Sequence, residues 1–363
     1  MMDAPAPFRI VASDMDGTVL NSSHDLSPYT METLLQLSMR HGVEFVFATG
    51  RHHLSVDKAR SELSAFFATR FATAAAAGAE LRVQTASPGF FLVTSNGARI
   101  HDPAGKLIVA HDLDPDVVRT LYREYGLPYT LRHGPDVVLE HAVGTSPSLP
   151  DAPHISATHE ALLEGDDENP EEVVSTSAYT TDEWFITAPF MPLPEMEKKF
   201  GVRPYVVPFD AADPANAAGS VFDGFPVDGV GKVCFRCSDR HILDAMERRI
   251  REQFGDRVSV AMSSTRCLDV MASRISKASA LDEIVKLLSA RHGGRALTMK
   301  DVIAFGDSMN DEVMLERVGK GCVMANAQER LKRTLPKCEV IGNNDADGVA
   351  VKLREVFGIM VDV

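Results

Sequence analysis

Short apolar runs alternate with segments of helical periodicity along the first hundred residues of the chain. The apolar runs, each of which stops at a polar cluster, occupy residues 8–12, 43–48 and 90–94. Runs of this length that end abruptly are typical of buried parallel strands. Between them, apolar residues recur at helical spacing over about residues 33–39 and 55–67, and Gly42 suits the end of the first helix. Strands that alternate with helices predict a parallel, doubly wound α/β sheet.

The middle of the chain departs from this pattern, and its last part returns to it. Residues 100–113 predict a β-hairpin, and an amphipathic helix at 242–254 lies between two further predicted strands. Alternation of helix and strand resumes at residues 277–288, 302–305, 322–324 and 340–341. We therefore predict an α/β core that is split between residues 1–112 and 266–363. A second α/β domain, residues 113–265, is inserted between the two halves.

Two segments interrupt these patterns. Residues 71–79 are rich in alanine and follow a predicted helix, which favours an expanded connection to the next strand. Residues 144–181 are rich in Ser, Pro, Asp and Glu and hold few apolar side chains, which predicts a flexible acidic insertion in the second domain. The charges of this insertion are most simply explained as a solvated surface.

Composition and charge narrow the class of protein. The chain has 363 residues, of which 45% are hydrophobic and 24% charged, as in an ordinary globular protein of about two domains. Its 37 basic and 51 acidic side chains give a formal net charge of −14, which argues against binding to nucleic acid or to an anionic membrane. The sequence shows neither a secretory signal nor an apolar stretch of about 18 residues, so we expect a cytoplasmic protein without a membrane span.

The five cysteines favour reduced thiols over a metal site. Cys234 and Cys237 form a C-x-x-C pair, but this pair lies inside a predicted strand. No second Cys or His pair stands at zinc-binding spacing in the sequence. We therefore expect these thiols to pack in the interior, as free cysteines commonly do.

The first candidate for chemistry is the sequence DMDGT at residues 14–18, directly after the first predicted strand. Residues two apart on an extended chain point the same way, so Asp14 and Asp16 address one point at the carboxyl edge of the sheet, where open α/β sheets bind ligands. Two close carboxylates repel, which separates their pKa values unless a cation neutralises them. One can then be an ionised nucleophile while the other delivers a proton. The alternative is a plain turn, for which Asp-Gly is common.

A second acidic cluster, GDSMND at residues 306–311, also follows a buried apolar strand. If a helix begins here, the carboxylates of Asp307 and Asp311 face one direction at its start. Helix capping is the alternative, but a cap needs one such residue and not two carboxylates with the amide of Asn310 between them. Hard oxygen ligands in this number suit Mg²⁺, which takes one or two carboxylates together with water and a substrate phosphate.

Two further signals concern a bound anion. Thr49 and Gly50 end the second predicted strand, where a hydroxyl and a backbone N–H can hold phosphate oxygens, although Thr-Gly is also a common turn. Lys277 falls in the first turn of a predicted helix, where the positive end of the helix dipole disfavours a cation. A lysine there is badly placed for stability unless a carboxylate or phosphate lies opposite, and simple solvation of the ammonium group is the alternative.

Taken together, these motifs resemble the haloacid dehalogenase superfamily of hydrolases, and specifically its Cof-type branch with a large α/β cap of class IIB. The four signatures are DMDGT at 14–18, ATGR at 48–51, Lys277, and GDSMND at 306–311. Supporting matches are TSNGA at 94–98, VMANA at 323–327 and NNDADGVA at 343–350. The resemblance covers both halves of the predicted core. It implies a Rossmann-like core sheet into which the second domain is inserted as the cap.

The resemblance implies a role for each matching residue. Asp14 would attack phosphorus and form an aspartyl-phosphate. Asp16 would protonate the leaving alkoxide and then act as base on the attacking water. Thr49 and the N–H of Gly50 would bind the phosphoryl group. Lys277 would hold Asp14 and offset the charge that develops during transfer.

The resemblance also implies a Mg²⁺ ion. Its ligands would be Asp14, the backbone carbonyl of Asp16, and Asp307, with Asp311 serving the water shell of the metal. Asn310 would support the phosphoryl site. The metal would cancel the repulsion between an anionic nucleophile and an anionic substrate.

We therefore expect a Mg²⁺-dependent phosphatase that hydrolyses a small phosphorylated metabolite, such as a sugar phosphate, beneath a cap. A phosphomutase of the same superfamily would use the same acids but return the phosphoryl group to its substrate. A haloacid dehalogenase proper needs no second acid like Asp16, so the intact D-x-D argues against it. A non-catalytic module that binds a phosphorylated ligand would have lost some of the acids, yet every core signature is present. The sequence predicts no particular oligomeric state.

Overall fold

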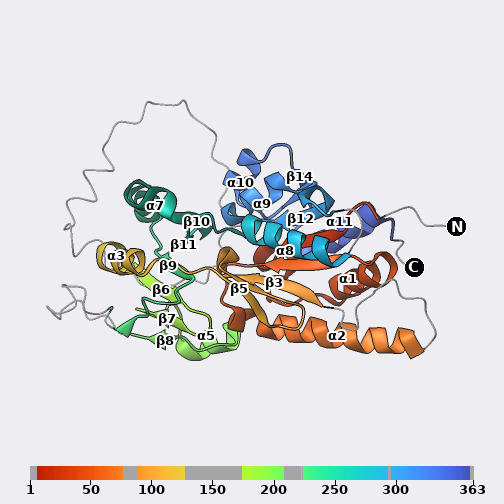
Figure 1. Ribbon diagram of the computed structural model, residues 1–363, viewed down its shortest axis with the longest axis horizontal. Coiled ribbons are helices and arrows are strands. Elements are labelled where there is room, and N and C mark those ends of the chain that lie inside the picture. Colours follow the sequence, from red (N-terminus) through yellow and green to blue (C-terminus); the bar gives the residue numbers. More distant parts are fainter. Residues whose placement is uncertain are drawn as a thin grey trace.

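In the computed structural model, residues 6–76, 89–126, 174–207, 222, 224–292 and 296–359 are described, and they form two lobes, each built around its own sheet (Figure 1). The larger lobe, called the core below, contains β1 (Ile10–Asp14), β2 (Glu44–Ala48), β3 (Phe90–Thr94), β4 (Arg99–His101), β5 (Leu107–Ala110), β12 (Val302–Gly306), β13 (Lys320–Met324) and β14 (Glu339–Ile341). Their order in the sheet is β14-β13-β12-β1-β2-β3-β4-β5. All pairs from β14 to β3 are parallel, and β4 and β5 are added antiparallel.

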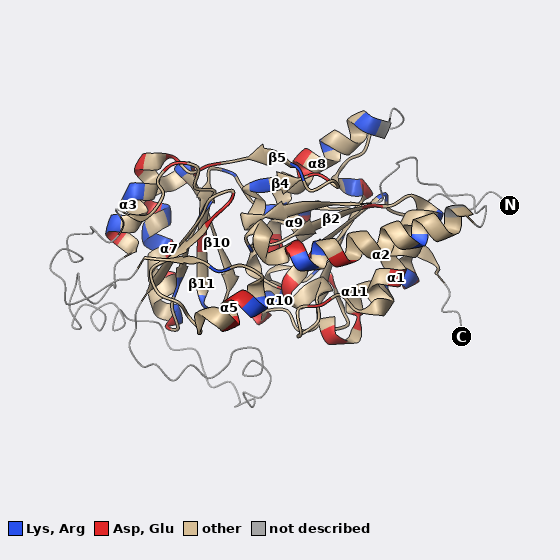
Figure 2. Ribbon diagram, turned by 90° about the horizontal axis from the view of Figure 1, so that it is seen from below, with Lys and Arg blue, Asp and Glu red and all other residues tan. Residues whose placement is uncertain are grey.

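Helices cover both faces of the core sheet. They are α1 (Pro28–His41), α2 (Asp57–Ala76), α8 (Lys277–His292), α9 (Glu312–Arg317), α10 (Glu329–Thr334) and α11 (Gly348–Phe357). Figure 2 shows α1, α2 and α11 on one side of the strands and α8 on the other, with basic and acidic positions interspersed along the helices. The ends of α1 follow the sequence: Ser27 caps its first turn by accepting from the Thr30 N–H at 3.0 Å, and Gly42 ends it with φ of 62°. The predicted doubly wound α/β core is confirmed.

The smaller lobe, called the cap below, contains a six-stranded, mainly antiparallel sheet. Its strands are β6 (Ser175–Tyr179), β7 (Trp184–Ile186), β8 (Tyr205–Val206), β9 (Lys232–Arg236), β10 (Val258–Ser264) and β11 (Cys267–Ala272). The helices of the lobe are α3 (Pro115–Tyr125), α5 (Leu193–Phe200) and α7 (Arg240–Phe254). The strand order is β10-β11-β9-β6-β7-β8, and a hydrophobic cluster of its own packs on the sheet.

The strand β11 changes where the cap ends along the chain. It pairs with β10 and with β9, so the sheet of the cap runs to Ala272, beyond residue 265 where the sequence pattern set the border. A border at that point would cut a β-hairpin in two. We propose that the cap ends after Ala272 and that the core resumes just before α8.

Two expectations from the sequence were wrong in part. The alanine-rich segment was expected to be a connection, but α2 continues through Ala76, because alanine has the highest helix propensity and extends a helix already begun. The end of the acidic segment 144–181 was expected to be flexible, but Ser175–Tyr179 form β6, an inner strand of the cap sheet. Its hydroxyl groups are hydrogen-bonded, as where Thr176 donates to the Gly126 carbonyl at 3.2 Å, so a polar strand can be buried. Residues 77–79 and 144–173 lie outside the described residues.

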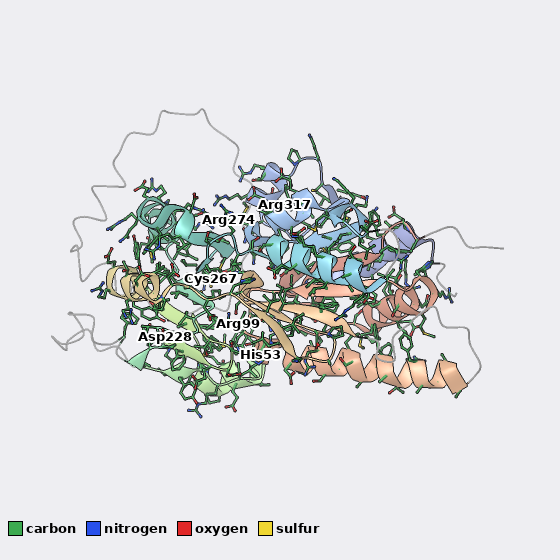
Figure 3. The ribbon with its side chains drawn as sticks, viewed as in Figure 1. His53, Arg99, Asp228, Cys267, Arg274 and Arg317 are labelled. Atoms are coloured by element: carbon green, nitrogen blue, oxygen red, sulfur yellow. The ribbon has the colours of Figure 1, made fainter. Side chains whose placement is uncertain are left out.

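The two lobes meet around Arg99, a buried residue of β4 that is labelled in Figure 3. Its guanidinium donates to Thr181 Oγ1 at 3.0 Å and to the Gly229 carbonyl at 2.8 Å, both in loops of the cap. It also pairs with Asp112, in the segment that leads from the core into the cap, at 2.6 Å. One buried cation thus fixes the connecting segment and two cap loops against the core.

Among the described residues, no helix combines the length and apolarity that crossing a bilayer would need. Within the same part of the chain, the cysteines are free, and Cys234 and Cys237 are buried, as the sequence predicted.

Candidate active site

The site begins where β1 ends at the carboxyl edge of the core sheet. Asp14 is the last residue of β1 and is buried, and the chain then turns sharply at Gly17 with φ of 69°. A Cβ at this position would lie only 2.7 Å from Asp307 Oδ2 and would clash with it. Glycine is therefore required both for the left-handed backbone and for the close approach of the second acidic loop.

Lys277, the first residue of α8, lies between two carboxylates. Its Nζ donates to Asp14 Oδ1 at 2.5 Å and to Asp311 Oδ1 at 2.7 Å, and both the lysine and Asp311 are fully buried. The sequence indicated that a lysine at a helix start needs an opposing anion, and two carboxylates supply it. They raise the pKa of Lys277 above its ordinary value, although burial alone would lower it.

Asp307 and Asp311 belong to the second acidic loop, which runs from the end of β12 through the short turn η7 (Met309–Asp311). Asp311 Oδ2 accepts from the backbone N–H groups of Asp307 and Ser308, each at 3.1 Å, so this residue does cap the turn. The other oxygen of Asp311, Oδ1, accepts a hydrogen bond from Lys277 Nζ, and a helix cap alone does not require this contact. Asp307 accepts from Thr18 Oγ1 at 3.3 Å and from Ser308 Oγ at 3.1 Å, which orients its carboxylate toward β1.

Asp14, Asp307 and Asp311 make a compact group that is suited to a divalent metal. Each offers one oxygen, and the three oxygens lie within 4.8 Å of one another. Three carboxylates and the ammonium of Lys277 would leave two uncompensated negative charges in a buried place. Accordingly, burial and the Asp311 and Asp16 charges raise the pKa of Asp14 to about 7, although Lys277 opposes them. Burial and the charges of Asp14 and Asp311 likewise raise the pKa of Asp307. Hard oxygen donors that carry two uncompensated negative charges fit Mg²⁺, which supplies two positive charges.

The carboxylate of Asp16 lies outside that group. It pairs with Arg51, whose Nε donates to Asp16 Oδ2 at 2.6 Å and whose Nη2 donates to the other oxygen, and it contacts His24 Nδ1 at 3.2 Å. Burial pushes the pKa of Asp16 upward, but Arg51 and His24 outweigh it and lower the pKa to about 2. Two carboxylates two residues apart therefore have their pKa values moved in opposite directions.

The direction of that separation depends on the charge around each group. In the protein alone Asp14 keeps its proton more readily than Asp16, whereas the roles implied by the resemblance need an ionised Asp14 and a protonated Asp16. A cation at the acidic group would favour the ionised form of Asp14. An anion bound beside Arg51 would favour proton uptake by Asp16.

Thr49, Gly50 and Asn310 lie around this centre. Thr49 follows β2, which neighbours β1 with Ala48 opposite Asp14, and its Oγ1 accepts from the Arg51 N–H at 3.0 Å. Asn310, in η7, donates from Nδ2 to Asn96 Oδ1 at 3.0 Å. The Oδ1 atom of Asn310 is buried and has no hydrogen-bond partner within the described part of the chain.

Several residues of the site were not assigned from the sequence. Asn96 belongs to a motif that was noted only as a supporting match, and it lies in the turn η3 (Ser95–Gly97) with φ of 55°. A Cβ at the next residue, Gly97, would lie 2.3 Å from the Ser276 carbonyl oxygen. A left-handed asparagine followed by an obligatory glycine was the signal that could have identified this turn. Lys232 of β9 and Asp269 of β11 reach the site from the cap, where they contact Gly50 and Asn96. The sequence did not indicate this role, because charged residues in strands usually face solvent.

Comparison with known proteins identifies the family of the chain. The profile of the haloacid dehalogenase-like hydrolase family matches residues 11–126 and 167–353. A Haemophilus influenzae protein named "Putative phosphatase" is 30% identical over 97% of this chain and 98% of its own. A Yersinia pestis protein named HMP-PP phosphatase is 26% identical over 94% of this chain and 93% of its own. A solved structure described as a subclass IIB sugar phosphatase superposes with a TM-score of 0.56 at 16% identity, covering 97% of this chain and 100% of that one.

The family profile spans both halves of the core and most of the cap, and it includes every acidic residue discussed above. The chain belongs to the haloacid dehalogenase-like hydrolases, and it shares its fold with the structure described as a subclass IIB sugar phosphatase.

Proposed function

We propose that this phosphatase hydrolyses a small organic phosphomonoester, with Mg²⁺ at the acidic group and an aspartyl-phosphate on Asp14. One observation carries the proposal. Asp14 lies in a negatively charged group with the buried Asp311 and the half-buried Asp307, and Lys277 Nζ donates to its carboxylate at 2.5 Å. A carboxylate that is fixed in this way at the carboxyl edge of the sheet is placed to attack a substrate that enters between core and cap.

The metal would be held by Asp14, Asp307 and the backbone carbonyl of Asp16, with Asp311 ordering its water shell. When bound, Mg²⁺ supplies positive charge that offsets the repulsion between the anionic nucleophile and the anionic ester. The remaining work falls to side chains of the chain itself. Lys277 orients Asp14 and balances part of the charge on the transferring phosphoryl group.

Hydrolysis proceeds by two displacements in this proposal. An oxygen of Asp14 forms a bond to phosphorus while the bond from phosphorus to the ester oxygen breaks, and the leaving alkoxide takes a proton from Asp16. In the second step a water oxygen attacks the phosphorus of the aspartyl-phosphate and gives its proton to Asp16. The bond to Asp14 breaks, and inorganic phosphate leaves. Thr49, the N–H of Gly50 and the amide of Asn310 hold the phosphoryl oxygens in both steps.

The substrate class rests on the relatives. One of them is named for HMP-PP and one solved neighbour is described as a sugar phosphatase, and both names denote small phosphorylated molecules. A small metabolite ester also suits a site that lies where two lobes meet. A sugar phosphate is the first compound class to be examined.

Phosphate release from a panel of phosphorylated metabolites and from p-nitrophenyl phosphate tests the proposal. We expect release that stops with EDTA and returns with added Mg²⁺. Activity that is indifferent to chelation would contradict the metal assignment. Isomerised sugar phosphate without free phosphate would instead identify a phosphomutase, and ligand binding without any product would identify a non-catalytic module.

A further inference from the structure

Lys232 and Asp269 form a buried ion pair on the face of the cap sheet that meets the core. Lys232 is the first residue of β9, and Asp269 lies on the adjacent strand β11. Their side chains are 3.1 Å apart and only 3% and 0% exposed. Removing two charges from water is costly, and apolar side chains of similar size would hold two lobes together at least as well. The pair therefore needs an explanation beyond adhesion between the lobes.

Both members of the pair reach across to the core. Lys232 Nζ donates to the carbonyl oxygen of Gly50 at 2.7 Å. Asp269 Oδ2 accepts from Asn96 Nδ2 at 2.6 Å. The cap thus contacts the turn after β2 and the turn after β3, which neighbour each other at the carboxyl edge of the core sheet. These are two of the loops that surround Asp14.

The contact with Asn96 is passed on to the phosphoryl site. Asn96 Oδ1 accepts from Asn310 Nδ2 at 3.0 Å, and the same oxygen would lie 3.1 Å from a Cβ at Gly50. An ionised carboxylate can only accept, so Asp269 requires the NH₂ group of Asn96 to face the cap. The carbonyl of Asn96 must then face Asn310, and this in turn fixes the orientation of the Asn310 amide. The second N–H of Asn310 Nδ2 then stays available to donate to a phosphoryl oxygen.

We propose that Lys232 and Asp269 are positioning residues that align the phosphoryl site when the cap is docked. Lys232 fixes the peptide after Gly50, and Asp269 fixes the amide of Asn310 through Asn96. The groups that hold the phosphoryl oxygens are therefore aligned only when the cap is docked. This alignment does not depend on the organic part of the substrate. This inference rests on the proposed phosphatase function, because Gly50 and Asn310 are given their roles there.

The first test is Asp269→Asn, because an amide can present its NH₂ group to Asn96 and release the enforced orientation. With p-nitrophenyl phosphate we expect kcat to fall by about tenfold to a hundredfold, while KM changes much less. Asp244→Asn is the matched control: it neutralises a cap carboxylate that pairs with Arg240 at 2.8 Å on the surface of α7, and it should leave kcat unchanged. A variant that changes KM alone would show that Asp269 contacts substrate and does not position Asn310.

A second variant separates positioning from folding. Either single change, Asp269→Asn or Lys232→Met, leaves one buried charge unpaired and should lower the melting temperature. The double variant Lys232→Met/Asp269→Asn is neutral, so we expect its melting temperature to recover while kcat stays low. Recovery of both quantities would overturn the proposal and leave the pair a structural contact.

A double-mutant cycle tests the route through Asn310. If Asp269 acts through that amide, Asp269→Asn should cost little further activity in an Asn310→Ala background, whereas additive losses would overturn the route. Calorimetric titration with inorganic phosphate gives a readout without turnover: we expect Asp269→Asn to weaken binding severalfold, and unchanged affinity counts against the proposal. If the wild-type protein binds phosphate in this way but hydrolyses no ester, the phosphatase proposal fails while the positioning inference is still tested.

Discussion

Two buried lysines, one in each lobe, are placed beside aspartates in different ways. In the core, Lys277 contacts Asp14 and Asp311, and Asp307 belongs to the same acidic group. In the cap, Lys232 pairs with Asp269. The core group therefore has more carboxylates than cations, whereas the cap pair is balanced.

This difference in charge separates two kinds of buried polar group. An unbalanced group is unfavourable until a cation or a proton joins it, and the raised pKa values of Asp14 and Asp307 express that deficit. A balanced pair carries no net charge that calls for a further ion, so we expect it to act through the groups it orients. The core group is therefore expected to bind and react, and the cap pair to position. The following predictions test that distinction.

The largest expected effect is that of Asp14→Asn. The amide keeps the shape of the side chain but is a poor nucleophile, so turnover of p-nitrophenyl phosphate should fall by about a thousandfold or more. Circular dichroism should show an unchanged fold. Because Asp269→Asn removes a buried carboxylate from the balanced pair, it is the informative comparison and should retain far more activity. Similar losses of turnover in Asp14→Asn and Asp269→Asn would contradict the distinction between the reactive core group and the positioning cap pair.

Lys277→Met should destabilise the protein more than Lys232→Met. The first change leaves three carboxylates without their ammonium partner, and the second leaves one. Breaking a buried pair costs about 3–5 kcal/mol, so Lys277→Met should reach or exceed this range in the free energy of unfolding measured with urea. Mg²⁺ should stabilise every variant with an intact acidic group, so each loss is measured against the wild type at the same Mg²⁺ concentration. On that scale, Mg²⁺ should reduce the loss in Lys277→Met and leave the loss in Lys232→Met unchanged. Equal losses, or equal rescue, would contradict the difference in charge balance.

The core group could be predicted from the sequence because its geometry follows from topology. Asp14 and Asp307 each end a short apolar run, and the carboxyl ends of parallel strands meet at one edge of a sheet. Lys277 was recognisable because a cation at a helix start is unfavourable without a partner. The strand order, in which β12 lies next to β1, was not predicted from this alternation and comes from the structure.

The cap pair could not be predicted by the same reasoning. Lys232 and Asp269 lie on antiparallel strands, and the pattern does not reveal which face of such a strand meets another lobe. Asp16 shows a related limit: the sequence placed it beside Asp14, but its partner Arg51 comes from a different loop and reverses the direction of its pKa shift. Local patterns identify which residues can do chemistry, and packing between distant segments decides their charge states.

A smaller effect is expected from pH. The pKa of Asp14 is about 7 in the folded, metal-free protein and near 3.8 when unfolded, so the folded state holds a proton between these values that the unfolded state has lost. Stability should therefore fall as pH rises through this window, and the melting temperature should drop by several degrees between about pH 5 and about pH 7.5. Mg²⁺ competes with that proton, so its stabilising effect should grow over the same range. In Asp14→Asn both trends should be weaker, and a flat profile in the wild type would contradict the charge deficit.

The smallest effect concerns the other carboxylate of the first motif. Arg51→Met removes the main group that lowers the pKa of Asp16, while burial, which raises it, remains. The nitrophenolate of p-nitrophenyl phosphate leaves without protonation, so Asp16 is needed chiefly as the base that accepts a proton from water in the second step. A higher pKa then moves the acidic limb of the kcat profile to higher pH, by about one unit. The matched control is Lys58→Met, which removes an exposed cation that pairs with Asp25 at 3.0 Å and should leave the limb in place. An unmoved acidic limb in Arg51→Met would mean that Asp16 is not the base, and the chemistry would then have to be assigned to the unbalanced group alone.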